Sequence, residues 1–174
     1  MRTEAKYREG LKELIIEKPL AEINVVSLCE YVGSNRQTFY YHYRDISDVI
    51  ENIFLKEKIG SSRKFSSFEA ITKSVISYVN TNYRFLYEIS KSYAAEKISE
   101  FLYSFYYKNM ISIYNTGKSN HSVIIRYMST VASKEFLFWI STKRKEKSAS
   151  LLKRVCILWD YLMNRYEGEL KKKQ

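Results

Sequence analysis

Gly33-Ser34-Asn35-Arg36-Gln37-Thr38-Phe39-Tyr40-Tyr41-His42-Tyr43 is the segment of this chain that says most about its structure. Gly33 supplies the backbone freedom that a sharp turn needs, and either of the two polar residues after it can cap a following helix. On that helix Phe39 and Tyr43 are four residues apart and share one face. The opposite face carries Arg36, Gln37, Tyr40 and Tyr41. The segment therefore predicts a short helix with an aromatic back and a polar front.

The polar front has the chemistry of a DNA-reading helix. Arginine and glutamine make bidentate hydrogen bonds to guanine and adenine edges. The hydroxyl of tyrosine or threonine and the ring of histidine suit phosphate oxygens. We therefore predict that this helix enters a major groove. The predicted DNA-binding residues are Ser34, Asn35, Arg36, Gln37, Thr38, Tyr40, Tyr41, His42 and Arg44.

The residues before the turn complete a helix-turn-helix at about residues 24–43. A helix is expected to begin near Asn24, a good N-cap. Its apolar stripe is Val25, Leu28, Cys29 and Val32. Two short helices joined by a glycine-containing turn are the unit that presents a recognition helix. An amphipathic helix from about Thr3 to Glu17 precedes them and stops before Pro19. A further helix is expected from Ser47 to Gly60, a natural C-terminal stop.

Residues 3–54 resemble the DNA-binding domain of the TetR/AcrR (tetracycline-repressor) family of transcriptional regulators. The resemblance rests on Ile23-Asn24-Val25, Leu28, Val32-Gly33, Thr38-Phe39-Tyr40-Tyr41-His42-Tyr43 and Asp45. The segments 36–40 and 45–48 look most like a Firmicutes branch that includes regulators similar to the dihydroxyacetone-kinase regulator. One position departs from the family pattern. Most members have a phosphate-contacting lysine where this chain has Ile46, so Arg44 or backbone N–H groups would have to supply that contact.

The resemblance implies an all-α chain of about nine helices in two domains. A three-helix DNA-binding domain would occupy residues 1–46, and a helical effector-binding and dimerisation domain would occupy residues 47–174. Apolar periodicity in the second half agrees, and strand-like alternation is absent. The helices expected there run over about 68–80, 83–90, 94–114, 122–140 and 148–166.

The last two helices carry more apolar side chains than one narrow stripe would bury. The surplus predicts a second partner, and the resemblance implies that this partner is another copy of the chain in a four-helix bundle. The predicted interface residues are Phe138, Trp139, Val155, Trp159 and Leu162. A two-fold dimer would bind a palindromic double-stranded operator. The alternative is a wholly intramolecular core.

The whole chain contains sixteen tyrosines and nine phenylalanines. This aromatic content suggests an effector pocket in the second half of the chain. The candidate lining residues are Tyr78, Tyr103, Tyr106, Tyr107 and Tyr127. For each of them, packing in the core is the competing interpretation. The favoured function is a repressor released by a small molecule. The alternative is a DNA-binding adaptor or activator that is controlled by a protein partner and has no small-molecule ligand.

The distribution of charge and the residue composition narrow the possible functional classes of the protein. Residues 1–60 hold nine Lys/Arg and ten Asp/Glu, net −1, whereas residues 61–174 hold twenty and nine, net +11. The basic excess thus lies outside the helix-turn-helix and is not an argument for DNA binding. Two histidines and two cysteines, with no phosphate-binding glycine loop, argue against an enzyme, a metal site or a cofactor. No apolar stretch approaches a membrane span and no targeting segment is apparent, so a cytoplasmic protein is expected.

Overall fold

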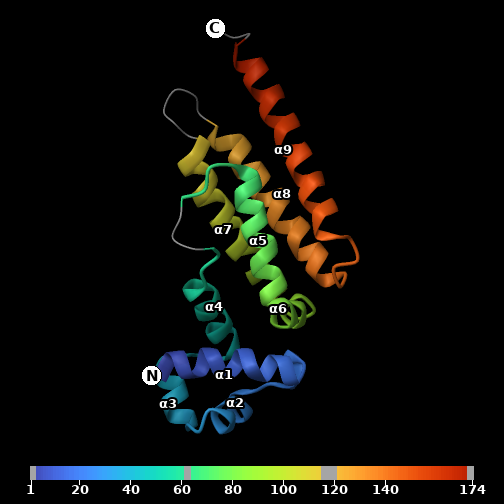
Figure 1. Cartoon of the computed structure of the whole chain (residues 1–174). Helices are drawn as coiled ribbons and strands as arrows, with labels where there is room; N and C mark the ends of the chain where they lie inside the picture. The colour runs from blue at the N-terminus through green and yellow to red at the C-terminus, as the bar shows by residue number, and fades with distance from the viewer. Residues whose placement is uncertain (1–2, 61–63, 115–120, 172–174) are drawn as a thin grey trace. The chain divides into compact units, whose positions relative to one another are not determined.

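The structure is a computed structural model that describes residues 3–60, 64–114 and 121–171. In these ranges the regular structure consists of nine α-helices and one 3-10 turn, without a strand, which confirms the all-α prediction (Figure 1). The helices are α1 (Thr3–Glu17), α2 (Val25–Tyr31), α3 (Arg36–His42), α4 (Ile46–Lys56), α5 (Phe68–Thr81), α6 (Tyr83–Ser90), α7 (Ala95–Tyr114), α8 (Ser122–Ser141) and α9 (Ser148–Lys171). The 3-10 turn (Leu20–Glu22) lies between α1 and α2.

The chain forms two compact units. The first contains the described residues up to Lys58 together with Asn82–Ile98, and the second contains Ile59–Thr81 together with the described residues from Ser99 onward. Helix α6 and the first residues of α7 therefore belong to the unit that holds the helix-turn-helix. The division into functional domains after residue 46 stays a prediction.

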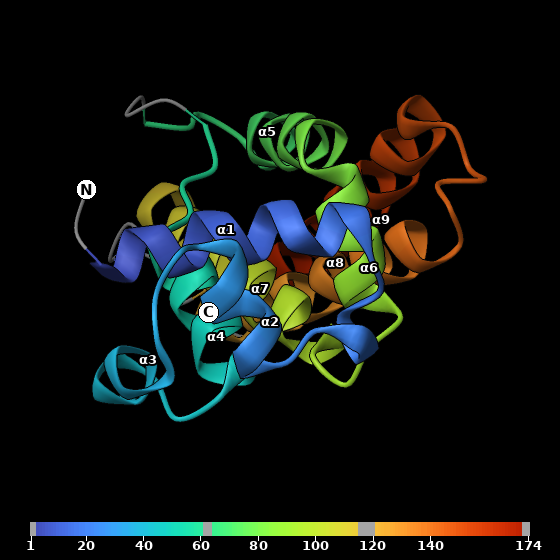
Figure 2. The ribbon, with the colours of Figure 1, turned by 90° about the horizontal axis from the view of Figure 1, so that it is seen from below.

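Helix α1 is the centre of the first unit. Its buried side chains recur at the spacing of one helical face, and they are Tyr7, Leu11, Leu14 and Ile15. Helices α2, α4 and α6 all pack against α1. In Figure 1 α2 and α3 lie below α1, and Figure 2 shows the unit from that side, with α3 beside α1. A Cβ atom at Gly10 would lie 2.3 Å from the Cγ1 atom of Val32. Only glycine therefore permits the close approach of α1 and α2.

Helix α4 begins and ends earlier than the sequence suggested. It begins at Ile46 because the carboxylate of Asp45, not the hydroxyl of Ser47, is the N-cap and accepts from the Asp48 N–H at 2.9 Å. It ends at Lys56 because Glu57 has extended backbone angles, with φ −64° and ψ 146°. Gly60 has a positive φ of 77° and lies in the segment that follows the helix.

Large aromatic side chains form the core of the second unit. The ring of Phe68 on α5 stacks on Trp159 of α9 at 5.2 Å between centroids and packs on Tyr106 of α7 at 5.7 Å. Phe136 of α8 also packs on Tyr106, at 6.3 Å between centroids. All four rings are at most 4% exposed. Both cysteines of the protein are free thiols, Cys29 buried and Cys156 half-buried.

Candidate nucleic-acid interface

The turn between α2 and α3 is fixed by a chain of backbone and cap hydrogen bonds. Gly33 has a positive φ of 59°, and the Ser34 N–H donates to the carbonyl of Cys29 at 2.8 Å. The side-chain oxygen of Asn35 accepts from the Thr38 N–H at 2.8 Å, so Asn35 is the N-cap of α3. At the start of α2, Asn24 forms a reciprocal capping box with Ser27. These bonds set where α3 begins and which way its first turn points.

The two faces of α3 are separated as the sequence predicts. Phe39 and Tyr43 are buried, with exposed fractions of 0% and 5%. Arg36, Gln37, Tyr40 and Tyr41 are all exposed, and Tyr41 reaches 85%. Both buried rings make T-shaped contacts with the ring of Tyr7 on α1, at 5.3 Å and 6.0 Å between centroids. The aromatic back of α3 is thereby held against α1 while its polar front faces solvent.

Two other residues predicted to contact DNA, Thr38 and His42, are less exposed to solvent. Both are half-buried, and the Nδ1 atom of His42 lies 3.7 Å from a carboxylate oxygen of Glu4. The Tyr41 ring packs edge-on against His42 at 5.0 Å. Their role in DNA binding stays a prediction.

Arg44 is exposed but already engaged. Its Nε atom donates to Oδ2 of Asp48 at 2.7 Å, and a second guanidinium nitrogen donates to Oδ1 of the same carboxylate. These hydrogen bonds hold the pKa of Asp48 below its ordinary value. The pairing offsets the charge of Arg44, although the guanidinium keeps unused N–H donors and its side chain is 86% exposed. Ile46 is buried and apolar, so its side chain cannot supply a phosphate contact.

Lys6 is a candidate contact that the sequence did not reveal. Its ammonium nitrogen lies 4.0 Å from the position a Cβ of Gly33 would take, beside the turn that leads into α3, and the side chain is exposed. The sequence gives no signal for it because its place depends on how α1 crosses the turn. An ammonium there suits a backbone phosphate.

The five tyrosines predicted for an effector pocket lie in different environments. Tyr106 is fully buried and donates to the hydroxyl of Thr72 at 3.2 Å, and burial raises its pKa. Tyr78 is buried against Phe101. Tyr103 and Tyr107 are half-buried and stack on each other, and Tyr127 is 60% exposed. A shared pocket lined by these residues stays a prediction.

Most residues predicted for the dimer interface are buried within their own chain. Trp139, Val155 and Trp159 are 3%, 1% and 4% exposed, and Leu162 is half-buried. Phe138 is 65% exposed. The strongest apolar stripe of each helix is used first by the core of its own unit. Among the described side chains of α8 and α9, the exposed large apolar ones are Val123, Tyr127, Phe138, Ile157, Leu158 and Tyr161.

Among the described residues, no group of three or more His, Cys, Asp or Glu is placed so that it could hold a metal ion. No helix in the described ranges combines the length and the apolar character that crossing a membrane requires.

Comparison with known proteins identifies a solved structure with a similar fold. No protein-family model matches the sequence, and no curated protein matches it. A solved structure named "Dihydroxyacetone kinase operon activator DhaS" is similar over 94% of this chain and 97% of that chain, with a TM-score of 0.67 and 16% sequence identity. At this identity the likeness shows that the two chains share an all-helical fold.

Proposed function

We propose that this protein is a homodimeric transcriptional regulator that binds a palindromic DNA operator through α3. The observation that carries the proposal is the exposed front of α3, where Arg36 and Gln37 stand in the first turn after a capped N-terminus. A B-DNA major groove is about 12 Å wide and admits one helix. In helix-turn-helix proteins the N-terminal residues of that helix contact the base edges.

The N-terminal side chains supply reading and positioning contacts of different kinds. Arg36 and Gln37 are the proposed base readers, because their forked polar groups match guanine and adenine. Tyr40, Tyr41 and Lys6 are the proposed phosphate contacts, which fix register without reading sequence. The backbone N–H groups at the start of α3 add to them.

The proposed dimer uses the exposed apolar side chains of α8 and α9 named above. On α8 they are four and eleven residues apart, and on α9 they lie within five residues, so at 100° per residue each set falls on one side of its helix and is left in water by a monomer. A second copy of the chain would bury them in a four-helix bundle. Two-fold symmetry would then present two α3 helices to the two halves of an operator.

The direction of regulation has two candidates. A repressor released by a small molecule is the favoured one, in line with the resemblance of residues 3–54 to the TetR/AcrR family. An activator or adaptor under the control of a protein partner is the second, because the structurally similar DhaS is named an operon activator. In either case we propose a cytoplasmic protein without catalytic activity.

The experiment selects binding sequences from random DNA with the full-length protein and then compares variants on the selected site. Arg36→Ala should cost about 1–3 kcal/mol on the selected site and much less on random DNA. Tyr40→Phe should weaken both equally. Lys108→Ala, which removes an exposed lysine of α7, is the control and should change neither. Failure to enrich any sequence, or equal losses for Arg36→Ala on both DNAs, would contradict the proposal.

A further inference from the structure

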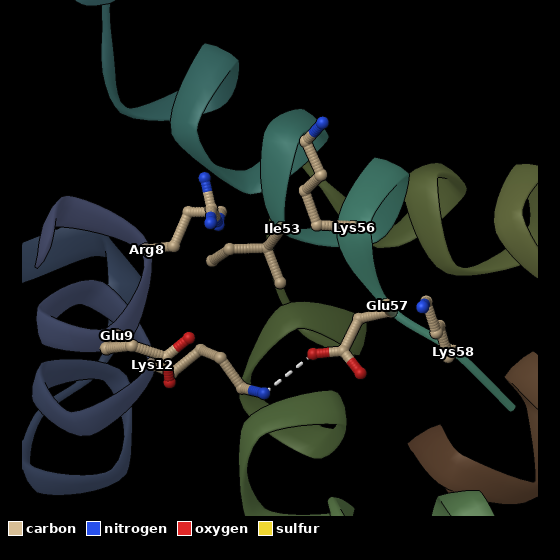
Figure 3. A pocket seen from close by; sticks show the side chains of 7 residues that line it. All are labelled: Arg8, Glu9, Lys12, Ile53, Lys56, Glu57 and Lys58. Carbon is tan, nitrogen blue, oxygen red and sulfur yellow. Dashed lines mark hydrogen bonds and ion pairs between the residues drawn. The ribbon is translucent and has the colours of Figure 1, made fainter. Parts of the chain in front are cut away.

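A cleft of about 300 Å³ lies in the first unit between α1 and the end of α4 (Figure 3). Its lining residues are Arg8, Glu9, Lys12, Ile53, Lys56, Glu57 and Lys58. The first three come from α1, and the others come from the last turn of α4 and the two residues after it. The cleft is thus bounded by two helices of one compact unit.

The cleft gathers positive charge in a part of the chain that is otherwise short of it. Residues 1–60 carry nine Lys/Arg and ten Asp/Glu, net −1. Four of those nine cations line the cleft with only two of the carboxylates, so the lining has a net charge of +2. A net positive concavity raises the local concentration of anions.

One of the four cations is neutralised and three are not. The ammonium of Lys12 pairs with a carboxylate oxygen of Glu57 at 2.6 Å, and both side chains are largely buried, at 22% and 16% exposure. For Arg8, Lys56 and Lys58, the described residues offer no carboxylate within ion-pair distance. Arg8 instead donates from Nη1 to the side-chain oxygen of Asn52, a neutral acceptor, at 2.9 Å.

We propose that this cleft binds the oxyanion group, carboxylate or phosphate, of a small metabolite. Arg8 is its main ligand, because the planar guanidinium fork matches both groups and keeps unused donors. Lys56 and Lys58 add charge from the opposite wall, and Ile53 offers an apolar contact beside them (Figure 3). A volume of about 300 Å³ stands at the lower end of the range for ligand sites.

The cleft is connected to the recognition helix through one shared acceptor. The Asn52 oxygen that accepts from Arg8 also accepts from the hydroxyl of Tyr43, at 3.3 Å. Tyr43 is the C-cap of α3. An anion that draws Arg8 away leaves Asn52 to Tyr43 alone, so binding changes how the end of α3 is anchored. This consequence rests on the proposed function, whereas anion binding itself does not.

The test is a titration of the full-length protein with inorganic phosphate and, separately, with succinate, at ionic strength held constant with sodium chloride. ¹⁵N-detected NMR would follow the Nε–H of Arg8 and the side-chain amide of Asn52. We expect saturable shifts of both signals with at least one of the anions. The anion that binds more tightly identifies phosphate or carboxylate as the preferred group.

Substitutions of the lining residues should change the Kd for the anion in different directions. Arg8→Gln should raise the Kd about tenfold or more, because it removes a charge-assisted hydrogen bond. Glu57→Gln should lower the Kd, because it frees Lys12 and raises the lining charge to +3. Lys73→Gln is the control: its lysine is exposed, pairs with Glu69 on α5 of the second unit, and should not change the Kd. Arg8→Gln could also lower the melting temperature of the protein. In that case the double variant Lys56→Gln/Lys58→Gln, which changes two exposed side chains, provides the same test. We expect it to weaken anion binding several-fold.

Several results would overturn the proposal. One is a titration that does not saturate. Another is an unchanged Kd in both Arg8→Gln and the double lysine variant. A third is a Kd that Glu57→Gln does not lower. The coupling to α3 is tested on DNA selected by the protein: the anion should change operator affinity in the wild type and not in Arg8→Gln. If no sequence is selected, the proposed function fails while the anion result stands. If operator affinity is unchanged by a bound anion, the coupling is wrong.

Discussion

The hydroxyl of Tyr7 lies 2.7 Å from the hydroxyl oxygen of Ser34 and so joins α1 to the residue before the N-cap of α3. Tyr7 is fully buried, and burial raises its pKa. Its ring also supports Phe39 on the back of α3. One α1 side chain therefore contacts both the start and the buried face of the proposed recognition helix.

We predict that Tyr7→Phe keeps the fold but weakens specific DNA binding more than binding to random DNA. The ring packing remains, while the lost hydrogen bond should lower the free energy of unfolding by about 0.5–1.5 kcal/mol. Chemical denaturation and binding titrations on selected DNA measure both. Ser34→Ala closes a double-mutant cycle: if Tyr7 acts through Ser34, the double variant should lose less than the sum of the single losses.

The Arg44–Asp48 pair predicts a pH dependence of stability. Arg44 holds the pKa of Asp48 below its ordinary 3.8, so the contribution is present above that value and is lost as pH falls through the lowered pKa. Asp48→Asn should therefore destabilise the protein at pH 7, and the difference from wild type should shrink as pH is lowered below about 4. Denaturation at a series of pH values measures it. A difference that stays constant down to pH 2 would show that the ion pair contributes nothing.

The dimer is predicted to depend on exposed side chains of α8 and not on the buried tryptophans. Introducing Glu at Tyr127 and Phe138 should give a folded monomer, because the charges would be buried at the interface without partners. Sedimentation at micromolar concentration measures it. Tyr93→Glu, at a 69% exposed position of the first unit, is the control and should remain dimeric. A monomeric wild type would remove the basis of the prediction.

The salt dependence of DNA binding should be shallow. Each subunit offers few cations near α3, chiefly Arg36 and Lys6, since Arg44 is paired with Asp48. The slope of log K against log salt is roughly −0.9 per neutralised phosphate, so about −3 to −5 is expected for the dimer. Titrations on a short operator at several salt concentrations measure it. A slope near −10 would instead assign DNA contacts to the basic residues 61–174.

Much of the local structure could be predicted from the sequence because the signals were local. The spacing of apolar residues gave the bounds of α1 and α6, and Asn24 and Asn35 both act as the caps that their type and position suggest. The opposite faces of α3 followed from helical periodicity alone. The start of α4 was missed by one residue because Asp45 and Ser47 are both good caps.

What depends on tertiary contacts could not be predicted. The pairing of Arg44 with Asp48 and the placement of Lys6 beside Gly33 need the packed arrangement of helices. Apolar periodicity also does not separate a stripe that faces the core from one that faces a partner. Trp139 and Trp159, predicted for an interface, are buried within the chain, and Tyr127, predicted for a pocket, is exposed; their roles in an interface and a pocket stay predictions.

The late contribution of α6 to the first unit has a consequence for the order of synthesis. Phe85 of α6 packs on Phe54 at 6.0 Å, and Arg84 donates to the carbonyl of Ile16 at 3.5 Å. The chain leaves this unit after Lys58 and returns at Asn82. A nascent chain that has emerged only to residue 60 therefore exposes the apolar surface that α6 later covers. The helix-turn-helix should gain its full stability on the ribosome only after residue 98 emerges, and grafting residues 1–46 onto another protein should transfer an incompletely packed unit.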